Sequence, residues 1–283
     1  MKLVFLHGLL GAPGMWHRVE AALARVATGY EAYALLLPGH TTAPWLLDAP
    51  AHYVAFDDVV DALATRLPPT AAGEPLCLVG YSLGARLALG LCARHPERIA
   101  RAVLVGVHPG FRDEAARTAR VAFDEGLAAQ LEKDGLEAFC DSWEKLPVFA
   151  SQATLPPDLR AARRSERLAH EPAALAWAMR ALTLGRMPAR DDLAALAPTI
   201  HLVTGALDEK FTAVNALLAR TAPQRTTHCI VEGAGHDLAL EAPAALASII
   251  KQLCDLPRAR TAPPSFTPAF RDEKPQEDTE TAS

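Results

Sequence analysis

A serine between two glycines is the strongest chemical signal in this sequence. The stretch Gly80-Tyr81-Ser82-Leu83-Gly84 follows a strand-like apolar run and precedes an Ala- and Leu-rich helical stretch. Strand, tight turn and helix in this order make a nucleophile elbow, in which small neighbours permit the turn and the serine hydroxyl stands above the sheet. The pattern predicts Ser82 as a nucleophile or base. A coincidental turn with a capping serine is the alternative, and the position between strand and helix favours the elbow.

A serine at neutral pH needs a histidine that takes its proton and a carboxylate that orients the histidine. Among ten histidines, His236 follows the last expected strand and precedes the last expected helix, so it lies in a loop at the same sheet edge as Ser82. Asp208 follows an earlier strand, which makes the chain order serine, aspartate, histidine, a known order for such triads. Glu209 is the neighbouring alternative. We therefore predict a Ser82–Asp208–His236 triad.

The same chemistry needs hydrogen-bond donors for a developing oxyanion. The amide after the nucleophile, that of Leu83, is one candidate, and the loop after the first strand commonly supplies the second. Here that loop is His7-Gly8-Leu9-Leu10-Gly11, so the Leu9 amide is the second candidate. The two glycines are also typical of a plain strand–helix turn, and both interpretations are compatible.

Alternating apolar runs and helical patterns supply the elements that must position these residues. The expected strands are Lys2–His7, Ala32–Leu37, Leu76–Gly80, Arg101–Gly106, Thr199–Thr204 and Thr227–Val231. The expected helices are Pro13–Val26, Phe56–Leu67, Leu83–Arg94, Val214–Ala222 and Ala242–Leu253. Continuous apolar strands alternating with helices predict an α/β fold, with a mostly parallel, doubly wound sheet.

The alternation breaks between residues 111 and 196, where the pattern is helical throughout. This stretch begins after one strand and ends before the next, so we expect a helical lid over the carboxyl edge of the sheet, where open α/β sheets bind ligands. Residues 1–110 and 197–256 would then form the core. Residues 257–283 are dense in Pro, Thr and charge, which predicts a disordered tail.

Composition excludes several classes of function. The 283 residues are 50% hydrophobic with a net charge of −5, which argues against a generally basic nucleic-acid-binding protein. No apolar run approaches the roughly 20 residues that span a bilayer. The five cysteines are widely spaced without a Cys-x-x-Cys pair, which indicates free thiols in a reducing cytoplasm and neither a metal site nor a disulfide framework.

Longer motifs carry a resemblance to a known family. They include Val4-Phe5-Leu6-His7-Gly8, Leu37-Pro38-Gly39-His40, Phe56-Asp57-Asp58-Val59, the run from Val79 to Arg86, His108-Pro109-Gly110, Trp143 with Pro147-Val148-Phe149-Ala150-Ser151, Asp208-Glu209-Lys210-Phe211 and Gly235-His236. On these residues the chain resembles the α/β-hydrolase superfamily. Within it, the chain is similar to the synthases that form 2-succinyl-6-hydroxy-2,4-cyclohexadiene-1-carboxylate by eliminating pyruvate in menaquinone biosynthesis.

The resemblance implies a small-molecule substrate with several carboxylates, no cofactor, and arginines that bind those carboxylates. The motif-matched arginines are Arg86, Arg120 and Arg164. Guanidinium groups suit this role because they bind carboxylates bidentately and keep their charge. A solvated arginine on a helix face is the alternative for each. Arg117 lies one turn from Arg120 and could take its role, and Arg164 has three neighbouring rivals, namely Arg160, Arg163 and Arg167.

The resemblance also implies that Tyr81 and Trp143 line the pocket, although either could be an ordinary core aromatic residue. The expected activity is a cytoplasmic lyase that uses the triad to abstract a proton from 2-succinyl-5-enolpyruvyl-6-hydroxy-3-cyclohexene-1-carboxylate and to expel pyruvate. A carboxylic-ester hydrolase with an acyl-serine intermediate is the alternative. A hydrolase-like binding protein without activity is a third interpretation, which the complete set of triad residues disfavours.

Overall fold

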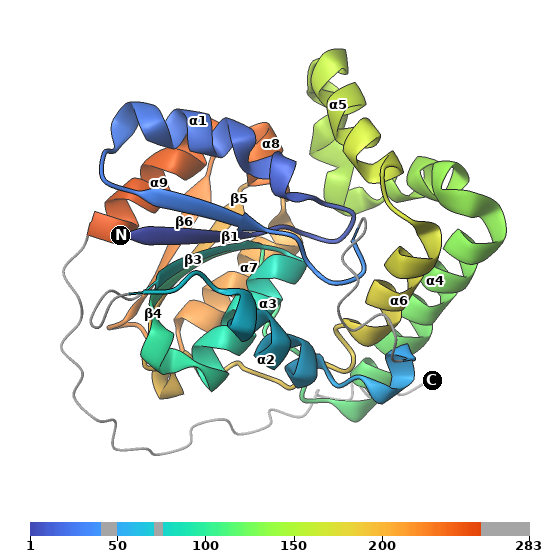
Figure 1. The fold of residues 1–283 in the computed structure, drawn as a ribbon, viewed down its shortest axis with the longest axis horizontal. Coiled ribbons are helices and arrows are strands. Elements are labelled where there is room, and N and C mark those ends of the chain that lie inside the picture. The colour runs from blue at the N-terminus through green and yellow to red at the C-terminus, as the bar shows by residue number, and fades with distance from the viewer. Residues whose placement is uncertain (41–49, 71–75, 256–283) are drawn as a thin grey trace, which may run out of the picture.

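Six parallel strands form one sheet at the centre of the molecule (Figure 1). The computed structural model describes residues 1–40, 50–70 and 76–255. The strand order is β2-β1-β3-β4-β5-β6, and every neighbouring pair runs parallel. The strands are β1 (Lys2–Leu6), β2 (Glu31–Leu35), β3 (Leu76–Tyr81), β4 (Ile99–Val105), β5 (Thr199–Gly205) and β6 (Thr226–Val231). The predicted parallel, doubly wound sheet is confirmed.

Helices cover both faces of this sheet. The helices of the core are α1 (His17–Val26), α2 (Phe56–Arg66), α3 (Leu83–Arg94), α7 (Glu209–Ala219), α8 (Leu238–Glu241) and α9 (Pro243–Asp255). Apolar side chains of α2 and α3 pack in one core cluster, and those of α1 and α9 pack in a second cluster with other strand residues. The central strands have no polar face because both faces are buried in this way. All six residues of β3 are buried.

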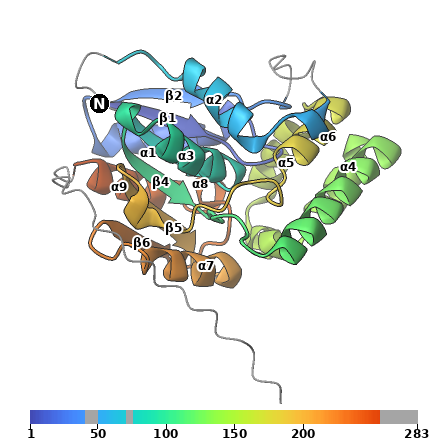
Figure 2. The ribbon, with the colours of Figure 1, turned by 90° about the horizontal axis from the view of Figure 1, so that it is seen from below.

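The chain between β4 and β5 contains three long helices and no described strand. These are α4 (Glu114–Trp143), α5 (Pro157–Leu168) and α6 (Pro172–Ala181), which lie together to one side of the sheet (Figure 2). α4 and α6 bury their own apolar cluster, which includes Leu131, Phe139 and Met179. We call this segment the helical insertion; its exact boundaries and its role as a lid stay predictions.

Short 3-10 turns complete the described chain, namely η1 (Pro13–Trp16), η2 (Ala51–Tyr53), η3 (Pro96–Arg98), η4 (Pro147–Thr154) and η5 (Leu193–Ala195). Several predicted boundaries differ from the observed ones by a few residues, and the largest difference is at α7, which begins at Glu209 and not at Val214. The helix starts early because the Asp208 carboxylate accepts a hydrogen bond from the Phe211 amide at 3.3 Å and caps its first turn.

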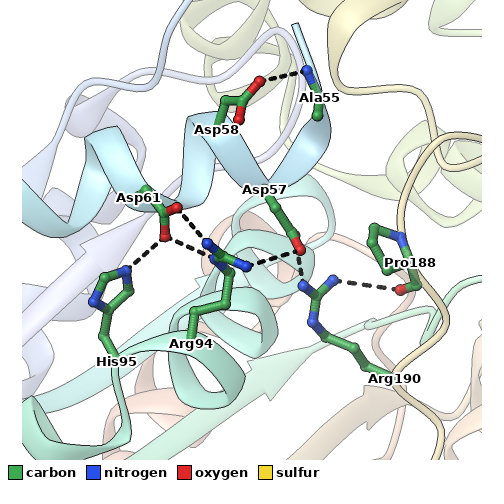
Figure 3. A network of polar contacts seen from close by, with 8 residues as sticks. All are labelled: Ala55, Asp57, Asp58, Asp61, Arg94, His95, Pro188 and Arg190. Carbon is green, nitrogen blue, oxygen red and sulfur yellow. Dashed lines mark hydrogen bonds and ion pairs between the residues drawn. The ribbon is translucent and has the colours of Figure 1, made fainter.

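The two ends of the insertion meet beside the sheet. The Arg190 amide donates to Pro109 O at 2.7 Å, and Arg112 forms two hydrogen bonds with Asp191 at 2.6 and 2.8 Å. The Arg190 side chain donates to Asp57 of α2 at 2.5 Å, and Asp57 also accepts a bond from Arg94 at the end of α3 (Figure 3). The insertion is therefore fastened to the helices on one face of the sheet.

Cys77, Cys92 and Cys140 are buried and Cys229 is half-buried, and none of these four forms a disulfide bond within the described residues. Among residues 1–40, 50–70 and 76–255, no helix has the length and apolarity needed to cross a membrane. The predicted disordered tail, residues 257–283, lies outside the described residues.

Candidate active site

Ser82 occupies a strained turn between β3 and α3. Its φ of 50° and ψ of −106° lie outside the common regions for a residue with a side chain. The turn is held by the Ser82 amide, which donates to Val105 O of β4 at 2.9 Å. A Cβ on Gly84 would lie 2.1 Å from Leu6 O, and one on Gly80 would lie 2.5 Å from Gly84 O. Both glycines are thus required by close backbone approach, as in a nucleophile elbow.

His236 and Asp208 are paired and buried at the same edge of the sheet. His236 Nδ1 lies 2.6 Å from Asp208 Oδ2, and both side chains are only 4% exposed. An ionised aspartate only accepts hydrogen bonds, so Nδ1 carries the proton and Nε2 is left with its lone pair. The His236 ring packs against Gly106, at which a Cβ would lie 2.6 Å from Cε1.

The end of β4 brings Ser82 and His236 into one neighbourhood. Val105 holds the Ser82 amide, and Gly106, the next residue, contacts the His236 ring. Within the described part of the chain, no hydrogen bond joins the Ser82 hydroxyl to His236. Such bonds are commonly long in unliganded enzymes and shorten when substrate binds. The triad as a catalytic unit stays a prediction.

The candidate oxyanion donors belong to the residue after Ser82 and to the turn after β1. Leu83 is the first residue of α3, where an amide has no acceptor within its own helix. Leu9 lies in a turn closed by the Gly11 amide, which donates to Gly8 O at 3.0 Å, and Leu10 in the same turn has a φ of 56°. The His7 side chain bonds to Gly8 O in this turn, and His170 of the insertion hydrogen-bonds to the Leu10 backbone.

His7 is a fully buried neutral histidine. Its Nε2 accepts a hydrogen bond from the Leu37 amide at 3.0 Å, so its Nδ1 donates to Gly8 O at 2.8 Å. The ring contacts that of His40 at 4.7 Å between centroids, and His40 in turn contacts His170 at 5.4 Å. Burial lowers the pKa of His7 to about 3. The loop that carries Leu9 is thus built on an uncharged imidazole.

His7 should make the free energy of unfolding sensitive to acid. The unfolded chain protonates His7 below its ordinary pKa of 6.5, whereas the folded chain does so only near 3. The unfolded state therefore holds more protons between these values, and the stabilisation present above pH 6.5 is lost as the pH falls toward 3. One histidine contributes a slope of about 1.4 kcal/mol per pH unit.

Urea unfolding between about pH 4.5 and pH 7 measures this slope, because that range covers about half of the interval between the two pKa values of His7. We expect His7→Gln to make it shallower, and His17→Gln, at an exposed position of α1, to leave it unchanged. An unchanged slope in His7→Gln would contradict a buried neutral His7.

One group of cations contains Arg86 and Arg120. Arg86 Nη1 donates to Leu182 O at 2.8 Å, and burial together with the nearby Arg120 guanidinium lowers the pKa of Arg86 to about 10. Arg120 Nε lies 2.9 Å from both carboxylate oxygens of Asp124. Burial, followed by the charges of Arg86, Lys210 and Arg120, lowers the pKa of His108 to about 4. The structure therefore brings Arg86 and Arg120 close together and places His108 and Lys210 near them, two basic residues to which the sequence assigned no role. The binding of substrate by Arg86 and Arg120 stays a prediction.

The second group lies on α5 and pairs with acidic residues at the end of α4. Arg164 lies 2.6 Å from Asp141 and 3.1 Å from Glu144, and Arg167 lies 2.8 Å from the other carboxylate oxygen of Glu144. Arg167 also lies over the Phe149 ring, with 5.5 Å from Cζ to the ring centroid, and the Phe149 ring lies 6.3 Å from that of His236. The role of Arg164 in binding a substrate carboxylate stays a prediction.

Aromatic side chains surround His236. The Tyr81 ring lies 5.2 Å from the His236 ring, and burial raises the pKa of Tyr81 well above its usual range. Trp143 packs on Phe149 at 5.7 Å and so lies one ring further out. Phe211 is closer to His236, at 4.5 Å. Phe149 and Phe211 both belong to motifs noted in the sequence, but the residue pattern by itself assigned them no role.

Among residues 1–40, 50–70 and 76–255, no group of three or more His, Cys, Asp or Glu side chains is placed to hold a metal ion. The site offers a serine, a histidine–aspartate pair, aromatic walls and two groups of cations. It is suited to proton transfer on an anionic substrate.

Comparisons with known proteins identify the family of this chain. The model of the alpha/beta hydrolase family matches residues 3–249. A 2-succinyl-6-hydroxy-2,4-cyclohexadiene-1-carboxylate synthase from Enterobacter sp. (strain 638) is 34% identical over 255 residues, covering 90% of this chain and 92% of that protein. The solved structure of MenH from S. aureus has a TM-score of 0.81 at 28% identity, covering 89% of this chain and 92% of that one. A thermophilic esterase from Thermogutta terrifontis shares the fold, with a TM-score of 0.74 at 20% identity over 90% of this chain and 89% of its own.

Proposed function

The chain belongs to the α/β-hydrolase family, and on that basis we propose that it is a lyase acting in menaquinone biosynthesis. Its substrate would be 2-succinyl-5-enolpyruvyl-6-hydroxy-3-cyclohexene-1-carboxylate, and its products 2-succinyl-6-hydroxy-2,4-cyclohexadiene-1-carboxylate and pyruvate. The similarity to the Enterobacter synthase over nearly the whole chain supports this activity. We place the reaction in the cytoplasm, which suits the free thiols of this chain.

One observation carries the proposal: several guanidinium groups gather near the candidate site. Arg86 and Arg120 are close neighbours, and Arg167 lies over Phe149, whose ring contacts that of His236. Asp124 pairs with Arg120 and Glu144 pairs with Arg167, whereas no carboxylate of the described residues lies within 4 Å of the Arg86 guanidinium. A carboxylate of the substrate would supply that counter-charge. A pocket for a neutral ester has no use for these cations.

In the mechanism that we propose, Ser82 is the base that touches the substrate. His236 Nε2 accepts the proton of Ser82 Oγ, and the serine oxygen removes a proton from the ring carbon next to the succinyl carbonyl. The electron pair of that C–H bond moves through the ring, and the C–O bond to the enolpyruvyl group breaks. The imidazolium of His236 then returns its proton to the leaving group, which becomes pyruvate. Negative charge that builds on the carbonyl oxygen is stabilised by the Leu9 and Leu83 amides.

The substrate-binding residues in this proposal are Arg86, Arg120 and Arg167, with Tyr81 against the ring. Trp143 supports Phe149 from behind and is not itself in contact with His236. Arg164, to which the family resemblance gave this role, pairs with the same Glu144 as Arg167 and stays a predicted carboxylate ligand beside it. The arginines hold the carboxylates so that the reacting C–H bond faces Ser82, which lowers the entropic barrier of the reaction.

The second candidate is a carboxylic-ester hydrolase, favoured by the elbow at Ser82 and the buried Asp208–His236 pair. Two assays with the same enzyme separate the candidates. One measures pyruvate released from the polycarboxylate substrate, and the other measures nitrophenol released from a short-chain nitrophenyl ester. We expect a far higher kcat/KM in the first assay. Ester hydrolysis without pyruvate release would overturn the lyase proposal.

Arg86→Lys should not behave as a conservative substitution. Lysine keeps the charge but loses the bidentate fork, and this loss is expected to cost about 1.5–3 kcal/mol, the scale of a hydrogen bond to a charged group. The kcat/KM for pyruvate release should fall by about 10- to 100-fold, while hydrolysis of a neutral ester should hardly change. Arg160→Lys, at an exposed position of α5, is the matched control. Equal losses on both substrates would show that Arg86 has a structural role only.

A further inference from the structure

We propose that Arg163 is a positioning residue for His236, through a buried ion pair that joins α5 of the insertion to the loop carrying the histidine. The inference rests on the proposed role of His236 as the base. It concerns a residue with no role in the mechanism above, one helical turn before Arg167.

The ion pair is formed with Asp237, the residue directly after His236. Arg163 Nη2 lies 3.2 Å from Asp237 Oδ2, and the two side chains are 6% and 4% exposed. The other terminal nitrogen of Arg163 donates to Glu166 at 2.6 Å within α5. Breaking a buried pair leaves an uncompensated charge in a medium that solvates it poorly. The partner that remains must then move toward water or attract a proton.

The loop around His236 transmits such a movement. Glu241 accepts hydrogen bonds from the amides on both sides of the histidine, from Gly235 at 2.6 Å and from Asp237 at 3.1 Å. Asp237 Oδ1 caps α8 by accepting from the Leu240 amide at 3.1 Å. Two carboxylates thus hold a short loop, and the guanidinium of Arg163 is the cation paired with it among the described residues. Loss of that cation leaves Asp237 and Glu241 to repel each other across His236.

Two contacts fix the position of the His236 ring. On one side Nδ1 is bonded to Asp208 at 2.6 Å, and on another the ring lies against Gly106. A shift of the loop therefore moves Nε2 relative to Ser82. Displacements of about 1 Å at a catalytic group cost about 10²-fold in rate. Arg163 should accordingly affect the chemical step more than the binding of substrate.

The test uses Arg163→Met, Asp237→Asn and the double variant in the full-length enzyme, with Arg160→Met as the matched control on α5. Asparagine keeps the acceptor that caps α8. We expect each single variant to lower kcat for pyruvate release by about 10- to 100-fold with KM changed by less than about threefold. The double variant should be no slower than the slower single variant, because it contains neither half of the pair. It also removes the unpaired charge, so it stays informative if Arg163→Met folds poorly.

Two readouts do not depend on the natural substrate. The proton shared by His236 Nδ1 and Asp208 gives a low-field ¹H NMR resonance, which should shift or broaden in Arg163→Met and stay unchanged in Arg160→Met. The rate at which a sulfonyl fluoride labels Ser82 should fall in parallel with kcat.

An increase in KM at unchanged kcat would make Arg163 a substrate-binding residue and overturn the proposal. So would an unchanged resonance together with an unchanged labelling rate. If the enzyme releases no pyruvate at all, the proposed function fails, and the resonance and the labelling rate still decide the role of Arg163.

Discussion

Ser82→Ala is expected to lower kcat/KM for pyruvate elimination by about 10²–10⁴-fold, the range contributed by a positioned acid–base group. The variant should still bind substrate, since Arg86, Arg120 and Arg167 are unchanged. A residual rate above the uncatalysed reaction is therefore expected. Steady-state measurement of released pyruvate gives the value, and thermal unfolding checks that the variant is folded.

The same experiment tests what the serine oxygen does. Proton abstraction leaves no covalent record, whereas ester hydrolysis passes through an acyl-enzyme that appears as a burst and as a mass shift. We expect neither in the wild-type enzyme quenched during turnover, and slower elimination from substrate deuterated at the abstracted position when that step limits the rate. A Ser82 adduct on the productive path would contradict the lyase mechanism and favour the hydrolase.

Asp208→Asn is expected to lower kcat by about 10⁴-fold, the effect of this substitution where an aspartate fixes the tautomer of a catalytic histidine. The amide of asparagine can donate toward Nδ1, which moves the imidazole proton to Nε2 and leaves no base for Ser82. The side-chain oxygen that accepts from the Phe211 amide is retained, so the start of α7 is kept. The Tm should change little.

Asp113→Asn is the matched control. Asp113 also caps a helix, because its carboxylate accepts a hydrogen bond from the Ala116 amide at 2.7 Å. It is exposed and is not paired with a histidine. The kcat and Tm of this variant should match those of the wild type. If Asp208→Asn were fully active and Glu209→Gln were not, Glu209 would be the acid of the triad.

The sheet was predictable because burial on both faces leaves a plain mark on a strand. β3 is a nearly continuous apolar run and β4 ends in one, and the helices between such strands follow from their own apolar faces. The turn at Ser82 was predictable for a different reason. Only glycine fits at positions 80 and 84, because other backbone atoms approach these positions so closely. The start of α7 was missed because its cap is a side-chain contact made by a residue interpreted only as a catalytic acid.

The arginines of α5 were not predictable to the residue. Arg160, Arg163, Arg164 and Arg167 share the i, i+3, i+4, i+7 spacing of one helix face, and Arg163 and Arg164 lie about 100° apart at the two edges of that face. Arg163 and Arg167 are buried and pair with Asp237 and Glu144. Arg164 is half-buried between Asp141 and Glu144, and Arg160 is exposed. Only the packing of α5 against its neighbours decides this rotation, and the sequence of α5 has too few apolar residues to indicate it.

The ends of the helical insertion leave and rejoin the sheet at a single crossing, where the Arg190 amide bonds to Pro109 and Gly110 packs on Ala189. Because the two chain ends are bonded to each other at this crossing, β4 and β5 can keep their register with insertions of different length. An insertion exchanged at this crossing would leave the strand pairing in place, but it would also have to supply the contacts that the present insertion makes with the core, from Leu182 O to Arg86 and from Arg163 to Asp237.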